Sequence, residues 1–127
     1  MNKSILIVED DAISRQFLVD IFFDHFKGVN IVTAVDGEDA ISKIEHAPPT
    51  VLVLDMIMPR KTGYDVLKEL ADRKHNSPVI IQSGYVTKSN FRHNAPIPQS
   101  PLVFFPKPFD VRDMIQVLEL FLNDPKS

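Results

Sequence analysis

Short apolar runs alternate with amphipathic stretches along the whole of this 127-residue chain. Five of the runs are four to six residues long and rich in β-branched and aromatic residues, which predicts strands. They are Ser4–Val8, Asn30–Val35, Val51–Leu54, Val79–Gln82 and Leu102–Phe105. Because most of them are apolar at both odd and even positions, we expect a sheet that is covered on both faces.

The stretches between these runs carry apolar residues at helical spacing. The predicted helices are Ala12–Phe26, a stretch around Ala40–Ile44, Tyr64–Lys74 and a last one over Val111–Leu122. One set of apolar residues is expected to form the buried stripe of the first helix: Ile13, Phe17, Leu18, Ile21 and Phe22. The alternation of strand and helix predicts a doubly wound α/β fold with a parallel sheet, in a single domain over residues 1–127.

The segment between the fourth and fifth predicted strands differs from the rest of the chain. Residues Val86–Asn94 have room for about two helical turns, but Pro96, Pro98 and Pro101 prevent a longer helix. We therefore expect a fourth helix that is short or absent. Near the middle of the chain, Pro48-Pro49 is predicted to end the second helix.

Composition narrows the class of protein. The chain has 44% hydrophobic and 24% charged residues, no cysteine and a formal net charge of −3. These values exclude a disordered chain, a disulfide framework and a thiolate metal site. No run approaches the roughly 20 apolar residues of a membrane span, and the acidic balance disfavours direct binding of nucleic acid. The expected location is the cytoplasm, because the first acids follow too short an apolar run for a signal peptide.

Acidic residues follow two of the predicted strands directly, at the edge where doubly wound folds bind ligands. Glu9, Asp10 and Asp11 follow the first strand, and Asp55 follows the third. Carboxylates that converge in one crevice repel each other, and a hard divalent cation with oxygen ligands relieves that repulsion. The expected ion is Mg²⁺.

A hydroxyl group and an ammonium group follow two other strands. Ser83, with Gly84 beside it, follows the fourth strand, and Lys107 follows the fifth. Carboxylates, a metal ion, a hydroxyl and an ammonium on one edge of a sheet predict a site for a phosphoryl group.

Four motifs in this order resemble the receiver domain of two-component response regulators, over essentially the whole chain. They are Glu9-Asp10-Asp11, Asp55-Met56-Ile57-Met58-Pro59 with Gly63 beyond it, Ser83-Gly84, and Lys107-Pro108. The resemblance, closest to single-domain chemotaxis regulators, implies a flavodoxin-like sheet of five strands in the order 2-1-3-4-5. Pro78 with Ser83-Gly84-Tyr85 is similar to a subgroup of receivers with a reduced fourth helix.

The resemblance also implies a chemistry. Asp55 would accept a phosphoryl group from a sensor histidine kinase or a histidine phosphotransfer protein. Mg²⁺ would be held by Glu9, Asp10, Asp55 and the backbone carbonyl of Ile57, whereas Asp11 is predicted to be the N-cap of the first helix. Such a domain is not a dedicated enzyme, although it is expected to lose its phosphoryl group by autodephosphorylation.

A change of conformation follows phosphorylation in this family. Ser83 and Lys107 would each bind a phosphoryl oxygen, and Phe104 stands where the family turns an aromatic ring inward. The Lys107-Pro108 bond is a candidate cis peptide. A downstream protein would read the change, but neither that partner nor the oligomeric state can be named from the sequence.

Two other functions compete with this interpretation. A flavodoxin-like ligand-binding module would need a phosphate loop where the first acids stand. A Mg²⁺-dependent aspartyl phosphohydrolase would need a second acid at Ile57. We also hypothesise that Ile57 and Tyr85, each two positions beyond a site residue, hinder attack of water and prolong the phosphorylated state.

Overall fold

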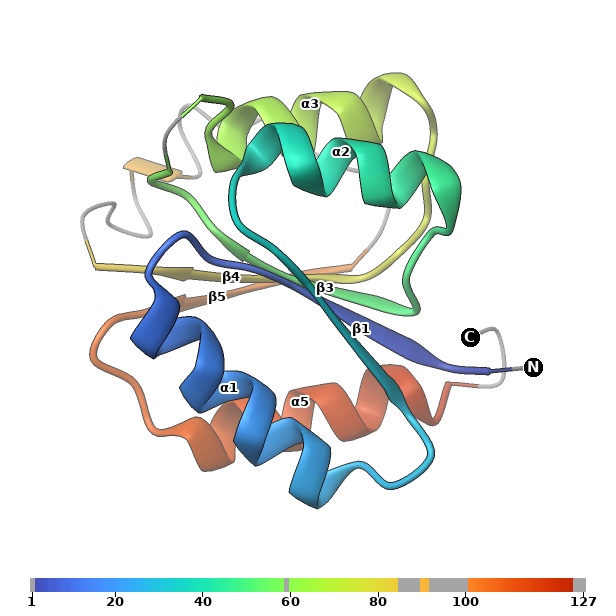
Figure 1. Ribbon diagram of the computed structural model, residues 1–127, viewed down its shortest axis with the longest axis vertical. Coiled ribbons are helices and arrows are strands. Elements are labelled where there is room, and N and C mark those ends of the chain that lie inside the picture. The colour runs from blue at the N-terminus through green and yellow to red at the C-terminus, as the bar shows by residue number, and fades with distance from the viewer. Residues whose placement is uncertain (1, 59, 85–89, 92–100, 125–127) are drawn as a thin grey trace.

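The computed structural model describes residues 2–58, 60–84, 90–91 and 101–124 of the chain (Figure 1). Five strands and four long helices make up this part. The elements are β1 (Ser4–Val8), α1 (Ala12–His25), β2 (Asn30–Ala34), α2 (Gly37–His46), β3 (Val51–Asp55), α3 (Gly63–Asp72), β4 (Val79–Ser83), β5 (Leu102–Pro106) and α5 (Val111–Leu122). All five predicted strands and the four predicted long helices are confirmed, with ends shifted by a few residues.

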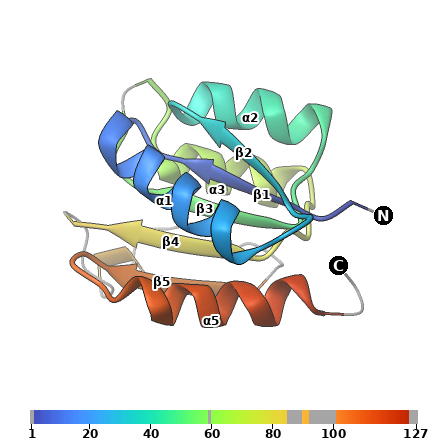
Figure 2. The same ribbon diagram turned by 60° about the horizontal axis from the view of Figure 1, so that its bottom comes forward.

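The five strands form one parallel sheet in the order β2-β1-β3-β4-β5, as Figure 2 shows. Helices α1 and α5 cover one face, and α2 and α3 cover the other (Figure 1). This is the doubly wound, flavodoxin-like arrangement expected from the sequence. Because all the strands are parallel, their carboxyl ends share one edge of the sheet.

Each face of the sheet has its own hydrophobic core. Leu52 and Leu54 of β3 belong to the core under α2 and α3, whereas Val51 and Val53 belong to the core under α1 and α5. Every residue of β3 is buried, because the strand lies in the middle of the sheet between two covered faces. The apolar character at both parities of this strand is thus explained.

The buried stripe predicted for α1 is wrong in its first two turns. Leu18 and Phe22 are 3% and 0% exposed, but Ile13 is 83% exposed and Phe17 is 56% exposed. Both side chains line a groove between α1 and the start of α5 instead of packing on the sheet. The spacing of apolar residues shows which side chains share one face of the helix, but it does not show that the first two turns of this face border a groove instead of the sheet.

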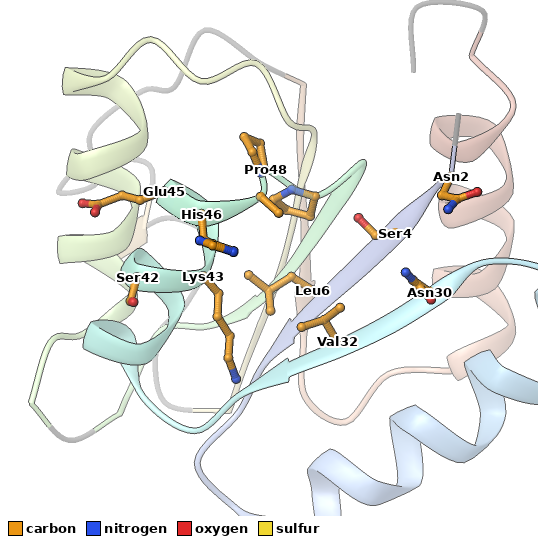
Figure 3. A pocket seen from close by; sticks show the side chains of 12 residues that line it. Asn2, Ser4, Leu6, Asn30, Val32, Ser42, Lys43, Glu45, His46 and Pro48 are labelled. Carbon is orange, nitrogen blue, oxygen red and sulfur yellow. The ribbon is translucent and has the colours of Figure 1, made fainter.

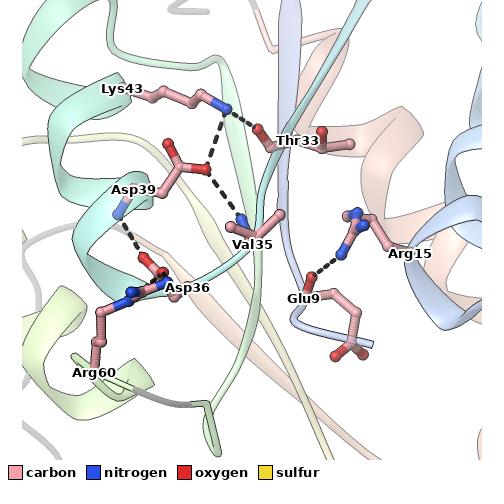
Figure 4. Close-up of polar contacts among 8 residues, drawn as sticks. All are labelled: Glu9, Arg15, Thr33, Val35, Asp36, Asp39, Lys43 and Arg60. Carbon is pink, nitrogen blue, oxygen red and sulfur yellow. Dashed lines mark hydrogen bonds and ion pairs between the residues drawn. The ribbon is translucent and has the colours of Figure 1, made fainter. Parts of the chain in front are cut away.

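Two residues of α2 cover part of the free edge of strand β2 (Figure 4). A carboxylate oxygen of Asp39 accepts a hydrogen bond from the backbone N–H of Val35 at 3.1 Å, and Lys43 donates to the carbonyl oxygen of Thr33. Edge strands with free backbone groups recruit strands of other chains, and such contacts reduce that tendency. Helix α2 itself ends at His46, ahead of the prolines that were predicted to stop it.

Only two residues are described between Gly84 and Pro101. Asn90 and Phe91 are helical, and the ring of Phe91 is buried with its centroid 5.3 Å from that of Phe104. The prediction of a short or absent fourth helix falls mostly outside the described residues. Among the helices that are described, none combines the length and hydrophobicity that a membrane span requires.

Candidate functional site

Three carboxylates meet at the carboxyl edge of the sheet. Glu9 and Asp10 follow β1, and Asp55 is the last residue of the neighbouring strand β3. One oxygen from each lies within 4.8 Å of the others. Glu9 is 1% exposed and Asp55 is 7% exposed, whereas Asp10 is exposed, so two of the three charges lie in the fold and one faces solvent.

The turn after β1 is fixed by its own polar groups. Asp11 accepts a hydrogen bond from the backbone N–H of Ser14 at 2.8 Å, which confirms it as the N-cap of α1. The backbone N–H of Asp11 donates to Glu9 at 3.2 Å, and Arg15 donates to the carbonyl oxygen of Glu9 at 2.9 Å (Figure 4). These bonds hold the Glu9 carboxylate beside Asp55 and leave Asp11 outside the cluster of acids.

Lys107 places the ammonium group in the same crevice. Its Nζ lies 3.2 Å from an oxygen of Glu9 and 3.9 Å from Oδ2 of Asp55. The backbone N–H of Lys107 donates to the carbonyl oxygen of Ser83 at 2.8 Å, which joins the ends of β4 and β5. Ser83 is 1% exposed at the end of β4, and the Lys107-Pro108 peptide is cis, as predicted.

The charges in this crevice do not balance. Burial, and then the negative charge of Asp55, raise the pKa of Glu9 above its usual value. Partial burial and a hydrogen bond with Glu9 raise the pKa of Asp10. Three carboxylates face one ammonium group, and their oxygens are the ligand type that Mg²⁺ prefers. The donor set therefore fits a magnesium ion.

We predict that Mg²⁺ binds more weakly as the pH falls. A raised pKa means that Glu9 takes up a proton at a higher pH than an ordinary glutamate, and the cation requires the ionised form. Below that pKa the apparent affinity should fall by up to about tenfold per pH unit. Calorimetric titration with Mg²⁺ between about pH 8 and pH 5 measures this. A constant affinity down to the ordinary carboxyl range would contradict the prediction.

The loop after β3 is held close to the phosphoacceptor candidate. The backbone N–H of Ile57 donates to Oδ1 of Asp55 at 3.3 Å, and that of Gly63 donates to the carbonyl oxygen of Met56 at 3.1 Å. Gly63 lacks a Cβ where one would lie 2.7 Å from the carbonyl oxygen of Asp55. The glycine predicted as part of the motif is thus required by the close approach of the two backbones. The Ile57 side chain is 44% exposed.

Two charged residues that support this loop were not singled out as a pair by sequence reasoning. Asp36 caps α2 and is 3% exposed, and Arg60, at a left-handed φ of 62°, lies 2.8 Å from it (Figure 4). The backbone N–H of Asp39 and the charge of Arg60 lower the pKa of Asp36. The pattern Asp36-Gly37-Glu38-Asp39 could have marked the start of α2 as a helix cap. The pairing of Asp36 with Arg60, 24 residues away, leaves no signal in the sequence.

The predicted switch residue Phe104 lies apart from the acids. Its partly buried ring packs on the core under α2 and α3, beside Phe91. Ile7 and Val53, two positions before Glu9 and Asp55, belong to the core under α1 and α5. Since side chains alternate along a strand, the ring and the acids lie on opposite faces of the sheet. Tyr85 lies outside the described residues, and its predicted role stays a prediction.

A hollow of about 780 Å³ lies away from this crevice (Figure 3). It opens between the C-terminal part of α2 and the amino ends of β1 and β2, with Leu6 and Val32 among its lining residues. The three clustered carboxylates of Glu9, Asp10 and Asp55 do not line it, and neither do Ser83 and Lys107. This hollow is therefore separate from the crevice at the carboxyl edge of the sheet that holds the clustered acids.

Comparison with known proteins decides the family. The sequence profile of the response regulator receiver domain matches residues 5–119 of this chain. The chain belongs to the response regulator receiver domain family.

Relatives of this receiver domain are themselves longer response regulators. The transcriptional regulatory protein CpxR of Klebsiella pneumoniae is 32% identical over 123 residues, which cover 97% of this chain and 50% of CpxR. Response regulator RR06 of Streptococcus pneumoniae is 35% identical over 80 residues, or 63% of this chain and 36% of RR06. The matched parts of this chain thus cover about a third to a little over half of the length of its first relatives.

Solved structures share the fold of this receiver domain. The receiver domain of the Francisella response regulator 1452 superposes with a TM-score of 0.79 at 26% identity, covering 95% of this chain and 97% of that one. TrrA of Thermotoga maritima, determined in complex with Mg²⁺ and BeF, gives 0.76 at 25% identity over 94% and 99% of the two chains. Membership in the receiver-domain family favours a phosphoacceptor function over the two alternatives, a flavodoxin-like ligand-binding module and a phosphohydrolase.

Proposed function

We propose that Asp55 is the phosphoacceptor of this receiver domain. An oxygen of its carboxylate would attack the phosphorus of a phosphohistidine, forming a P–O bond as the P–N bond to the imidazole breaks and the imidazole takes up a proton. The observation that supports this best is the position of Asp55, with Lys107 Nζ 3.9 Å from Oδ2 and two further carboxylates beside it. Its residual exposure of 7% leaves the carboxylate at the surface of the crevice.

We infer that Glu9, Asp10, Asp55 and the backbone carbonyl of Ile57 hold Mg²⁺ during this reaction. The bound cation would supply positive charge that offsets the charge on the phosphoryl oxygens in flight. Removal of the ion should stop the transfer, because Lys107 alone does not neutralise three carboxylates and an incoming phosphoryl group.

Lys107 and Ser83 would then hold the transferred group. Lys107 pairs with Glu9 in the structure, and a phosphoryl group on Asp55 offers it a more highly charged partner. The Ser83 hydroxyl would donate a hydrogen bond to a phosphoryl oxygen. The backbone N–H of Lys107 donates a hydrogen bond to the carbonyl oxygen of Ser83, and β4 pairs with β5. A movement of Ser83 or Lys107 would therefore be transmitted to β5 and Phe104. A shift of this kind is the proposed output that a partner protein reads.

Intact mass spectrometry tests the central proposal. The wild-type protein incubated with acetyl phosphate and Mg²⁺ should gain the mass of one phosphoryl group, and EDTA should prevent the gain. Absence of any gain with Mg²⁺ present would refute the proposal. A gain that EDTA leaves unchanged would refute the role of the acidic cluster.

Several narrower assignments stay predictions. They are a single receiver domain over residues 1–127, autodephosphorylation slowed by Ile57 and Tyr85, the cytoplasmic location, and the absence of direct contact with nucleic acid. The downstream protein also decides between two roles. A reader of the phosphorylated state would make the domain a switch, and a histidine phosphotransfer protein that removes the group would make it a carrier.

A further inference from the structure

Gln82, the residue before Ser83, is a buried polar residue that the proposed chemistry does not use. Its side chain lies in the interior with 2% exposure, and its Nε2 has no hydrogen-bond partner among the described residues. Buried donors without an acceptor destabilise a fold, so most of them are paired. Because Gln82 is next to the proposed phosphoacceptor, its side-chain amide could find its hydrogen-bond acceptor in the phosphorylated state of the site.

The sheet places Gln82 next to Asp55. The two residues are partners in the register of β3 and β4, and parallel neighbours lie about 4.8 Å apart across a sheet. Ile80 and Val53, two positions before each of them, both belong to the core under α1 and α5. Since side chains alternate along a strand, Gln82 and Asp55 lie on this same face.

Gln82 also lines the groove between α1 and the start of α5. The groove has a volume of about 490 Å³, and Lys107 contributes to its wall together with Gln82. Most of the other lining residues are apolar, with Ile13, Phe17 and Phe109 among them. The Lys107 ammonium only donates hydrogen bonds. The groove wall also carries Ser14 and Asp110, but Asp110 already accepts hydrogen bonds from Arg112. The acceptor that we single out for the Gln82 amide is therefore the group at Asp55, its partner in the register of β3 and β4.

Phosphorylation adds acceptors at this place. A phosphoryl group brings three acceptor oxygens and a charge near −2, and Lys107 is the ammonium group in contact with the acids. We propose that the Gln82 side-chain amide donates a hydrogen bond to the phosphoryl group on Asp55 and so stabilises the phosphorylated form. This proposal rests on the proposed function of Asp55.

Gln82→Met tests the proposal, because methionine has a similar volume and no donor. In the unmodified protein the substitution removes an unpaired buried donor, so the melting temperature should stay equal or rise. In the phosphorylated state it removes a bond to a charged acceptor. We expect the affinity for beryllofluoride with Mg²⁺, measured by NMR titration, to fall about tenfold. The lifetime of phosphorylated Asp55 should shorten as well.

Gln116→Met is the matched control, because Gln116 is an exposed residue of α5. It should leave the affinity for beryllofluoride unchanged. In the wild-type protein, the side-chain amide signals of Gln82 in a ¹⁵N NMR spectrum should shift when beryllofluoride and Mg²⁺ are added, which decides the question even if Gln82→Met does not fold. Equal affinities in the wild type and Gln82→Met, or amide signals that do not move, would overturn the proposal. Failure of the wild type to bind beryllofluoride would refute the proposed function instead.

Discussion

The Asp55→Asn variant should gain no phosphoryl group from acetyl phosphate under conditions in which the wild-type protein gains one. Asparagine keeps the shape of the side chain but lacks the anionic oxygen that attacks phosphorus. The same change removes one of the three clustered carboxylates, so the affinity for Mg²⁺ should fall by at least about tenfold. Intact mass measures the first effect and calorimetric titration measures the second.

Asp11→Asn is the matched control for this variant. Asp11 lies in the same turn as Glu9 but caps α1, and asparagine is as good an N-cap as aspartate. It should therefore accept a phosphoryl group as the wild type does. Asp55→Asn should also remain folded, because the charge of Asp55 is one cause of the raised pKa of Glu9 and its removal relieves repulsion. Uptake of a phosphoryl group by Asp55→Asn would show that another residue is the acceptor.

The site at the carboxyl edge of the sheet could be predicted from the sequence because its polar residues stand at or just after the ends of the predicted strands. Parallel strands bring their carboxyl ends to one edge whatever the details of packing. The acids after β1, Asp55 at the end of β3, Ser83 at the end of β4 and Lys107 after β5 were thus expected to meet. The structure brings Glu9, Asp55 and Lys107 into contact range.

The sequence could not predict ion pairs between distant loops, or which apolar residues of a helix stay exposed to solvent. Arg60 pairs with Asp36 across 24 residues, and no local pattern marks such a pair. Ile13 and Phe17 have the spacing of core residues, yet they lie beside a groove because the start of α1 is not covered by the sheet. Gln82 stands in an otherwise apolar run, so its place beside Asp55 became visible only in the register of β3 and β4.

The contact between the start of α2 and the loop after β3 should tolerate no added side-chain atom at Gly37 without a loss of stability. A Cβ at Gly37 would collide with the carbonyl oxygen of Lys61 and would lie 2.6 Å from its carbonyl carbon. Backbone atoms cannot rotate away as a side chain does. We therefore expect Gly37→Ala to lower the free energy of unfolding by about 3 kcal/mol and the melting temperature by about 10 °C.

Gly84→Ala is the matched control for Gly37→Ala, since the nearest atom to a Cβ there, among the residues that the structure describes, is the Lys107 Cβ at an ordinary 3.7 Å. This variant should unfold within about 1 kcal/mol of the wild type, because alanine fits the space and restricts the unfolded chain. Thermal and urea unfolding of the two variants measure the difference. The Asp36 to Arg60 ion pair lies beside Gly37, so the stability lost in Gly37→Ala should include this contact. Equal stability of the two alanine variants would show that the loop after β3 moves freely away from α2.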